Sequence, residues 1–292
     1  MNITRLRPEC LKCLADKYLD KYEKSASDEQ KLAYMQRTMQ LLAEAPKTYA
    51  APVLVKEITD IYTQIFGEPE NEYREIKWHF NKVMMHREAE LNKKIDEAED
   101  SLKLAIQYSM IGNYIDFGTM LAVDEEYLGK LLAEAAHNPV TDKEYESLKK
   151  ELEIGKKLVV ITDNCGEIVL DKLMIRAIQK LYSHLEITVI VRGGEVLNDA
   201  TMTDAVQVGM TDVVTVIDNG NDIAGTWMDS VSAEAKEAMD SADVILAKGQ
   251  ANFETLRGCG RNIYYLFLCK CEMFAREFNV PQYTGMLVRE RN

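Results

Sequence analysis

The stretch Leu158-Val-Val-Ile-Thr162 is a run of apolar and β-branched residues, and Asp163-Asn-Cys-Gly-Glu167 follows it directly. A short apolar run bounded by turn residues is typical of a buried strand. The next segment, residues 168–181, has the length and the apolar spacing of a helix. A strand, a polar turn and a helix in this order form the beginning of a βαβ unit. The stretch therefore predicts a parallel sheet with polar side chains at the carboxyl end of one strand.

The same pattern recurs along the second half of the chain. Further short apolar runs are Ile187-Thr-Val-Ile-Val191, Val213-Val-Thr-Val-Ile217, Val244-Ile-Leu-Ala247 and Ile263-Tyr-Tyr-Leu-Phe-Leu268. Helical stretches separate several of them, for example residues 233–239. We therefore predict a doubly wound, mainly parallel α/β/α sheet domain over residues 151–292. Ligands of such sheets bind beyond the carboxyl ends of the strands, near the point where the strand order reverses.

The first half of the chain predicts helices and no strand before residue 155. Ser27-Asp-Glu-Gln30 is a capping box, in which a side chain at each end of the motif caps a backbone N–H group at a helix start. Pro52 suits the first turn of a second helix, which Gly67 would end. Three more helices are predicted at residues 71–99, 102–110 and 125–136. Residues 1–150 are therefore predicted to form an all-helical domain.

Composition and charge narrow the classes of function. The chain has 292 residues with 35 Lys and Arg against 48 Asp and Glu, a net charge of -13, and no basic block that would bind nucleic acid. No apolar run approaches the roughly 18 residues of a membrane span, and the start MNITRLRPEC lacks the apolar region of a secretory signal. We therefore expect a cytoplasmic protein with mostly reduced cysteines and no nucleic-acid or membrane partner. Nothing in the sequence sets an oligomeric state.

Polar groups recur at successive strand ends. Asp163-Asn-Cys-Gly-Glu167 follows the first predicted strand, Arg192-Gly-Gly-Glu-Val-Leu-Asn-Asp199 the second, Lys248-Gly-Gln-Ala-Asn-Phe-Glu254 the fourth, and Lys270 the fifth. Any one of these loops is as often a plain turn as a site. Asp and Asn oxygens suit Mg²⁺ or Mn²⁺, while the lysines and the N-terminus of a helix after the first loop would attract phosphate. Their recurrence favours a metal or phosphate site.

These motifs resemble those of the damage-control phosphatase family, whose domain is also called acidic-residue-methyltransferase-like and was formerly a domain of unknown function. Asp163-Asn-Cys-Gly-Glu167 resembles the family's Asp-Asn-x-x-Glu signature, and Leu197-Asn-Asp-Ala-Thr201 its second metal loop. Lys248-Gly-Gln-Ala-Asn-Phe-Glu254 is similar to its Lys-Gly-x-x-Asn segment, and Ile111-Gly-Asn-Tyr-Ile-Asp-Phe-Gly118 to its Gly-Asn-x-x-Asp element. Cys10-Leu-Lys-Cys13 is similar to the CxxC motif of the mainly prokaryotic branch, so the resemblance covers nearly the whole chain.

The resemblance implies hydrolysis of a phosphate monoester by metal-activated water. The substrate would be a small phosphorylated metabolite, either a sugar phosphate or a damaged phosphometabolite, and the cofactor Mn²⁺, Co²⁺, Ni²⁺ or Mg²⁺. The residues implied are Asp163, Asn164 and Asp199 as metal ligands, Asn113, Asp116 and Glu167 in the substrate pocket, and Lys248, Asn252 and Lys270 at the phosphate. Of these, Asp163, Asn164, Glu167 and Asp116 would act in catalysis, with either Asp116 or Glu167 orienting the attacking water.

Two other functions stay open at this point. An S-adenosylmethionine-dependent carboxyl methyltransferase would fit the family's alternative name, but the chain has no G-x-G-x-x-G turn. A non-catalytic sensor of sugar phosphates or nucleotides would use the same pocket. Cys165 is not expected to act as a phosphatase nucleophile, because Arg176 is too distant to close a phosphate loop around it. Cys10 and Cys13 predict a structural or redox role, or packing alone.

Overall fold

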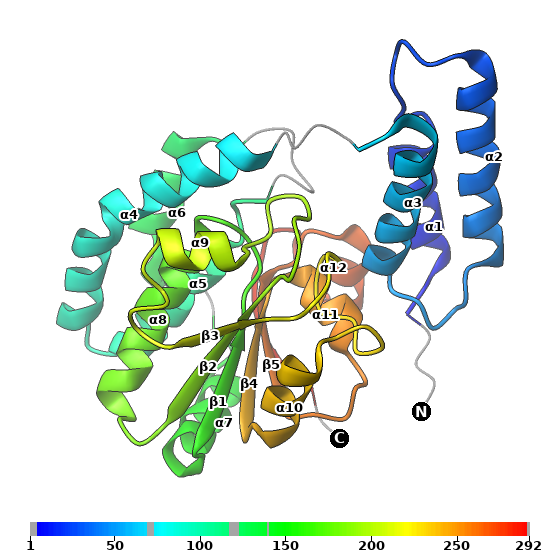
Figure 1. The fold of residues 1–292 in the computed structure, drawn as a ribbon. Helices are drawn as coiled ribbons and strands as arrows, with labels where there is room; N and C mark the ends of the chain where they lie inside the picture. Colours follow the sequence, from blue (N-terminus) through cyan, green and yellow to red (C-terminus); the bar gives the residue numbers. More distant parts are fainter. Residues whose placement is uncertain (1–4, 69–72, 117–122, 139, 291–292) are drawn as a thin grey trace. The chain divides into compact units, whose positions relative to one another are not determined.

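The computed structural model describes residues 5–68, 73–116, 123–138 and 140–290 (Figure 1). The chain divides into two compact units, Met1–Glu72 and Tyr73–Asn292. This division differs from the boundary predicted near residue 150. The reason is that α4 (Tyr73–Glu97) and α5 (Ser101–Gly112) pack against α8 (Glu167–Leu181) of the α/β part, so they belong to the second unit. The first two residues of the helix predicted at 71–99 lie outside the described residues.

The first unit is built from α1 (Pro8–Tyr18), α2 (Asp28–Glu44) and α3 (Ala51–Phe66). Tyr34 and Leu54 are central to its apolar core. The predicted capping box is confirmed at the start of α2, where the Ser27 hydroxyl accepts from Gln30 N at 3.2 Å and Gln30 Oε1 accepts from Ser27 N at 3.1 Å. Cys10 and Cys13 both lie on α1 and are not joined by a disulfide.

The second unit contains a six-stranded sheet, which confirms the predicted α/β class. The strands are β1 (Lys157–Ile161), β2 (Glu186–Val191), β3 (Thr215–Asp218), β4 (Val244–Lys248), β5 (Ile263–Leu268) and β6 (Gly285–Arg289). Their order is β3-β2-β1-β4-β5-β6, and only β6, which pairs with β5, runs antiparallel. The chain winds outward from β1 to β3 and then returns to β4, so the strand order reverses between β1 and β4.

The strand register brings the carboxyl ends of the central strands level with one another. Ile161, near the end of β1, pairs with Ile190 of β2 on one side and with Ala247 of β4 on the other. Successive residues of β1 point to opposite faces of the sheet. Leu158 and Val160 belong to the core that α5 and α8 share. The residues just beyond these strand ends therefore meet at the reversal point.

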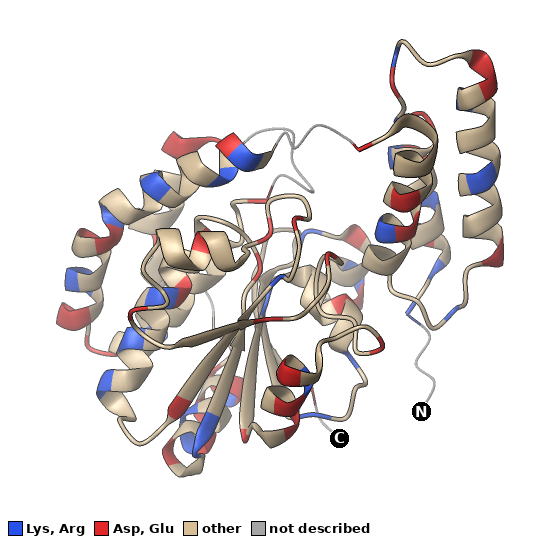
Figure 2. Ribbon diagram, viewed as in Figure 1, with Lys and Arg blue, Asp and Glu red and all other residues tan. Residues whose placement is uncertain are grey.

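Helices cover both faces of the sheet (Figure 1). On one face lie α4, α5, α8 and α9 (Met202–Gln207), and on the other α10 (Ala233–Ser241), α11 (Gln250–Leu256) and α12 (Glu272–Phe278). The remaining helices are α6 (Glu125–Ala133), a 3-10 turn (Ala135–His137) and α7 (Asp142–Ile154). Basic and acidic positions alternate along α4, so this helix presents no uniformly basic face (Figure 2). Among the described residues, no helix is long and apolar enough to cross a membrane.

Candidate active site

The loops after β1 and β2 are joined by backbone hydrogen bonds at the reversal point. Asn164 and Asp199 form an isolated antiparallel bridge. The N–H of Ala200 donates to the carbonyl of Asp163 at 2.7 Å, and the N–H of Cys165 donates to the carbonyl of Asn198 at 2.8 Å. These bonds place Asp163, Asn164 and Asp199, the three predicted metal ligands, side by side.

Two side-chain amides connect the carboxylates of Asp163 and Glu167. Nδ2 of Asn113 donates to Asp163 Oδ2 at 2.8 Å and to Glu167 Oε2 at 3.2 Å. Nδ2 of Asn164 donates to the same two oxygens, at 2.7 and 3.0 Å. The Oδ1 atom of Asn113 accepts from the N–H of Leu268 at 3.1 Å, which attaches the end of α5 to the end of β5. Asn113 therefore connects the end of α5 with the start of α8 and the end of β5. Because the Nδ2 atom of Asn164 is used in these hydrogen bonds, its amide oxygen is the atom suited to bind a cation.

Gly249 is a residue whose role the sequence analysis did not recognise. Its backbone has φ +80° and ψ +157°, a conformation that is essentially restricted to glycine. A Cβ atom at this position would lie 2.6 Å from Asp163 Oδ1 and closer still to the rest of that carboxylate. The glycine therefore gives the Asp163 side chain the space that it occupies.

Arg192 was also missed as a site residue, although its place directly after β2 could have identified it. Its side chain is fully buried, and Nε donates to Asp199 Oδ2 at 2.7 Å. Its Nη2 atom lies 3.6 Å from Asp163 Oδ1. Both Nη atoms lack a hydrogen-bond partner among the described residues. Arg192 therefore supplies positive charge to both acidic ligand candidates at once.

Burial and mutual repulsion make Asp163 and Asp199, the acidic pair of the site, hard to ionise without a further cation. Burial, together with the charges of Asp199 and Glu167, holds the pKa of Asp163 well above its usual range, although Arg192 opposes the shift. Burial raises the pKa of Asp199 to about 6 against the effect of Arg192, and the charge of Asp116 adds to the shift. The same charges would be favourable beside a bound cation.

The donor set fits a hard divalent cation. No group of three or more His, Cys, Asp and Glu side chains within the described ranges could hold a metal, so the candidate set consists of two carboxylates and an amide. Such oxygen ligands with open positions suit ions that keep several waters. When all five carboxyl groups of the buried network are ionised, they face three cationic groups, and a divalent cation would offset the excess of two negative charges. These groups are Arg192, Lys248 and Lys270, against Asp116, Asp163, Glu167, Asp171 and Asp199.

Lys248 is surrounded by acceptors from the protein itself. Its buried Nζ donates to Glu167 Oε1 at 2.6 Å, to Asp171 Oδ1 at 2.7 Å and to the carbonyl of Ser109 at 3.0 Å. Burial would lower the pKa of Lys248, but Asp171 and Glu167 outweigh it, so the pKa is raised. The three N–H groups of the ammonium are thereby used. This geometry favours a role in positioning Glu167 over the predicted contact with phosphate.

The side chain of Asn252 likewise makes its hydrogen bonds to neighbouring parts of the protein. Its Nδ2 donates to the carbonyls of Lys248 at 2.6 Å and Thr162 at 3.1 Å, and its Oδ1 accepts from the Thr226 hydroxyl at 3.0 Å. The side chain is fully buried. Asn252 therefore braces the ends of β1 and β4, and its predicted phosphate contact would require these bonds to be exchanged.

Lys270 reaches Asp116 across the site. Its Nζ donates to Asp116 Oδ2 at 2.5 Å, and its backbone N–H donates to Gln250 Oε1 at 3.1 Å. The Lys270 side chain is 4% exposed and that of Asp116 is 16% exposed. Phe117 and Gly118, which complete the motif around Asp116, lie outside the described residues.

The N-terminus of α8 does not offer the phosphate-binding N–H groups that the sequence predicted. Gly166 N donates to Asn81 Oδ1 at 2.7 Å, Cys165 N is taken by Asn198, and Asn164 N points to Glu167 Oε2 at 3.4 Å. Asn81 comes from α4, and nothing near it in the sequence signals this contact. Cys165 itself is buried, and burial raises the pKa of its thiol, which is unfavourable for a nucleophile.

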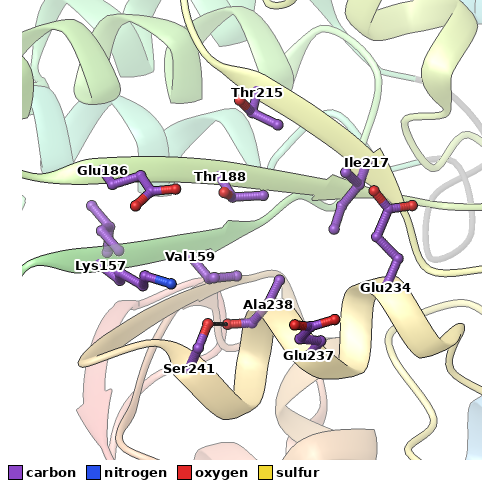
Figure 3. A pocket seen from close by; sticks show the side chains of 11 residues that line it. Lys157, Val159, Glu186, Thr188, Thr215, Ile217, Glu234, Glu237, Ala238 and Ser241 are labelled. Atoms are coloured by element: carbon purple, nitrogen blue, oxygen red, sulfur yellow. Dashed lines mark hydrogen bonds between the residues drawn. The ribbon is translucent and has the colours of Figure 1, made fainter.

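A cavity of about 240 Å³ lies away from the candidate active site. It opens between α10 and the sheet, where Lys157 and Glu186, the first residues of β1 and β2, line it (Figure 3). Glu234 and Glu237 face it from α10. Because the acidic pair lies beyond the opposite ends of these strands, the cavity is not part of the site.

Comparisons with known proteins match this architecture along nearly the whole chain. Residues 6–286 match the family model described as the damage-control phosphatase ARMT1-like domain. A damage-control phosphatase of Pyrococcus horikoshii is 30% identical over 99% of this chain and 98% of its own length. One from Archaeoglobus fulgidus is 30% identical over 94% of this chain and 96% of its own length. A crystal structure of a duf89 family protein from Pyrococcus horikoshii superimposes with a TM-score of 0.76 at 29% identity, covering 98% of this chain and 99% of that one.

Proposed function

The chain belongs to the damage-control phosphatase family, and on that premise we propose that it is a metal-dependent phosphoric monoester hydrolase. Family membership supports a phosphatase role in metabolite repair. The substrate that we propose is a small phosphorylated metabolite, either a sugar phosphate or a damaged phosphometabolite. The observation that supports the proposal is the backbone pairing of Asn164 with Asp199, which brings together the two loops that carry Asp163, Asn164 and Asp199.

We propose that Asp163, Asn164 and Asp199 hold the cofactor, which would be Mn²⁺, Co²⁺, Ni²⁺ or Mg²⁺. When bound, such an ion supplies polarisation of the phosphoryl group and a more acidic water. Arg192 keeps Asp199 in a fixed orientation through its Nε bond. Gly249 leaves room for Asp163. The protein thus prepares the ligand oxygens before any ion arrives, which lowers the cost of ordering them on binding.

The remaining groups bind and orient the substrate in this proposal. We assign contact with a phosphoryl oxygen to Lys270 and not to Lys248, because Lys248 donates all three of its hydrogen bonds to the protein. Asn113 and Glu167 are held by their mutual hydrogen bond, so they line the pocket as a fixed wall. A fixed wall restricts the orientations of the bound ester, which is one source of catalytic advantage.

The test removes the metal with a chelator and returns Mn²⁺, Co²⁺, Ni²⁺ or Mg²⁺ one at a time. Hydrolysis of an aryl phosphate and of a panel of sugar phosphates is measured after each addition. We expect at least one metal to restore turnover, and Asp199→Asn to lower it by at least about 100-fold. Asp218→Asn is the matched control, because Asp218 also ends a strand and its side chain accepts a local turn hydrogen bond from the N–H of Gly220, away from the proposed ligands. If none of the four metals restored hydrolysis, the proposal would be refuted.

A further inference from the structure

Helix α4 contacts both of the loops that carry the proposed metal ligands. The first loop, residues 162–166, follows β1, and the second loop, residues 192–201, follows β2. Lys77 and Asn81 lie four residues apart on α4, so their side chains share one face of the helix. Both residues are buried. Through these two side chains α4 forms hydrogen bonds and ion pairs with the loops and with α9, the helix that follows the second loop.

The carboxamide of Asn81 connects the two loops through its two ends. Its Oδ1 accepts from the N–H of Gly166, two residues after Asn164, at 2.7 Å. Its Nδ2 donates to Asp204 Oδ1 and to Gln207 Oε1 of α9, each at 2.8 Å. The oxygen and both N–H groups of the amide are thereby used. Asn81 thus accepts from the first loop and donates to the helix that continues the second.

Asp204 passes this contact on to the second loop. Its Oδ2 accepts from the N–H and from the hydroxyl of Thr201, two residues after Asp199, each at 2.8 Å. Lys77 Nζ lies 2.9 Å from the same oxygen and donates to Glu195 Oε2, within the loop, at 2.8 Å. Burial opposes the charge of Lys77, yet these two carboxylates prevail and raise its pKa. The second loop is therefore held from α4 at two points, Glu195 and Thr201.

We propose that Asn81 is a positioning residue of the metal site, which fixes the separation of the two ligand loops through Gly166 on one side and Asp204 on the other. This inference rests on the proposed metal-dependent function and assigns Asn81 no contact with metal or substrate. Residues that hold metal ligands in place from outside change metal affinity by about 10- to 100-fold when they are replaced. An effect of this size is expected here because Asn81 acts on both loops at once.

The partners of Asn81 explain why an amide is needed at position 81. The N–H of Gly166 can only donate, and the carboxylate of Asp204 can only accept. Asn81→Asp would set one carboxylate against another, and Asp204→Asn would leave two N–H groups facing each other whichever way the two amides are turned. With both substitutions, the carboxylate at position 81 accepts from Gly166 and from the amide at position 204, whose oxygen still accepts from Thr201. Each single change therefore breaks the contact, and the two together restore it.

Amide hydrogen exchange tests the positioning role in the metal-free protein. The N–H groups of Cys165 and Ala200 donate across the joined loops, so their exchange rates report on the local opening of the two loops. Asn81→Asp and Asp204→Asn should each speed both exchange rates by at least about 10-fold, and by more than the rates in the central strand β1. The double variant should return to within about 3-fold of wild type. Asn81→Ala, which removes the amide and adds no charge, replaces Asn81→Asp if that variant does not fold.

Calorimetric titration with Mn²⁺ gives the second measurement. Each single variant should bind Mn²⁺ about 10- to 100-fold more weakly than wild type, and the double variant should recover at least about 10-fold. Asn81→Asp adds a negative charge and Asp204→Asn removes one, so a long-range effect of charge alone would move the two affinities in opposite directions. Asn92→Asp is the matched control, because Asn92 also lies on α4 and donates to Asp96 of the same helix. It should change either measurement by less than about 2-fold.

The outcomes separate the positioning role from the proposed function. Single variants that bind Mn²⁺ as wild type does, affinities that move in opposite directions, or a double variant without recovery would overturn the role of Asn81 and leave the metal-dependent function intact. A wild-type protein that binds no divalent cation would overturn the proposed function. Asn81 would then remain the residue that joins the two loops, provided that the exchange rates rise in the single variants and recover in the double variant.

Discussion

An alanine at position 249 would place its Cβ atom inside the space of the Asp163 carboxylate, 2.6 Å from Oδ1 and closer to the other two atoms of the group. Alanine would also have to adopt a φ of +80° with a ψ of +157°. Gly249→Ala therefore combines backbone strain with displacement of a predicted metal ligand. Gly260→Ala isolates the first effect, because Gly260 also has a positive φ, +76°, but a Cβ atom there meets nothing within 4 Å.

The two effects can be given approximate magnitudes. The backbone strain at either position costs about 1–3 kcal/mol. Displacing Asp163 also disturbs the hydrogen bonds that its Oδ2 accepts from Asn113 and Asn164, and one such bond to a charged group contributes about 1.5–3 kcal/mol. We therefore expect Gly249→Ala to lose about 1.5–3 kcal/mol of unfolding free energy beyond Gly260→Ala. Gly249→Ala should also lose affinity for the metal, whereas Gly260→Ala should not.

Denaturation by urea, followed by tryptophan fluorescence, measures this difference. The two tryptophans of the chain, Trp78 and Trp227, both belong to the second unit, so their signal reports on the unit that contains the site. Calorimetric titration with Mn²⁺ gives the metal affinity of each variant. If Gly249→Ala matched Gly260→Ala in both stability and metal affinity, Asp163 would not depend on this glycine and the reasoning would be refuted.

Three further predictions follow from the buried ionisable side chains. Burial raises the pKa of Asp171 and of Asp199 to about 6 in the metal-free protein. The contribution of these two carboxyl groups to the stability of the second unit, about 3 kcal/mol each, is therefore fully present below about pH 4 and is lost as the pH rises through 6. A urea midpoint that stays flat from about pH 4 to 7 would contradict this. Lys248→Met leaves two buried carboxylates unpaired and should destabilise the unit by about 3–5 kcal/mol, with Asp171→Asn in the same chain recovering part of the loss in a double-mutant cycle. Cys165→Ala should keep hydrolysis within about 3-fold of wild type, because a buried thiol is not a nucleophile; a loss above 100-fold would identify it as one.

The parallel strands were predictable because a strand buried on both faces reads as an unbroken apolar run. β6 was missed, since it is an antiparallel edge strand with several half-exposed residues and carries a much shorter apolar stretch. The helices α4, α5 and α6 were expected, but their unit was not. Amphipathic spacing shows that a helix buries one face and says nothing of the element against which the face packs.

Lys248 and Lys270 show what the position of a residue in the sequence does not predict about the site. Each lies at or just after the end of a predicted strand, so each was assigned to phosphate for the same reason. In the structure the donors of Lys248 go to Ser109 and Glu167, which are 139 and 81 positions away in the chain, and to Asp171. Such partners follow only from the packing of α5 and α8 on the sheet. Strand-end position therefore locates a candidate group, while the number of its free donors depends on the tertiary fold.

The charge balance of the network implies an order of binding. Without a metal, five acidic side chains face three cationic ones, and whatever part of this excess is ionised opposes entry of a phosphate dianion. A divalent cation offsets the excess, and a phosphate can then approach Lys270 without creating a strongly negative site. We therefore expect inorganic phosphate to bind the metal-loaded protein at least about 10-fold more tightly than the metal-free protein at pH 7 in calorimetric titrations. Equal affinities would mean that the positive groups of the protein suffice by themselves, and the ligand assignment of Asp163 and Asp199 would lose its electrostatic basis.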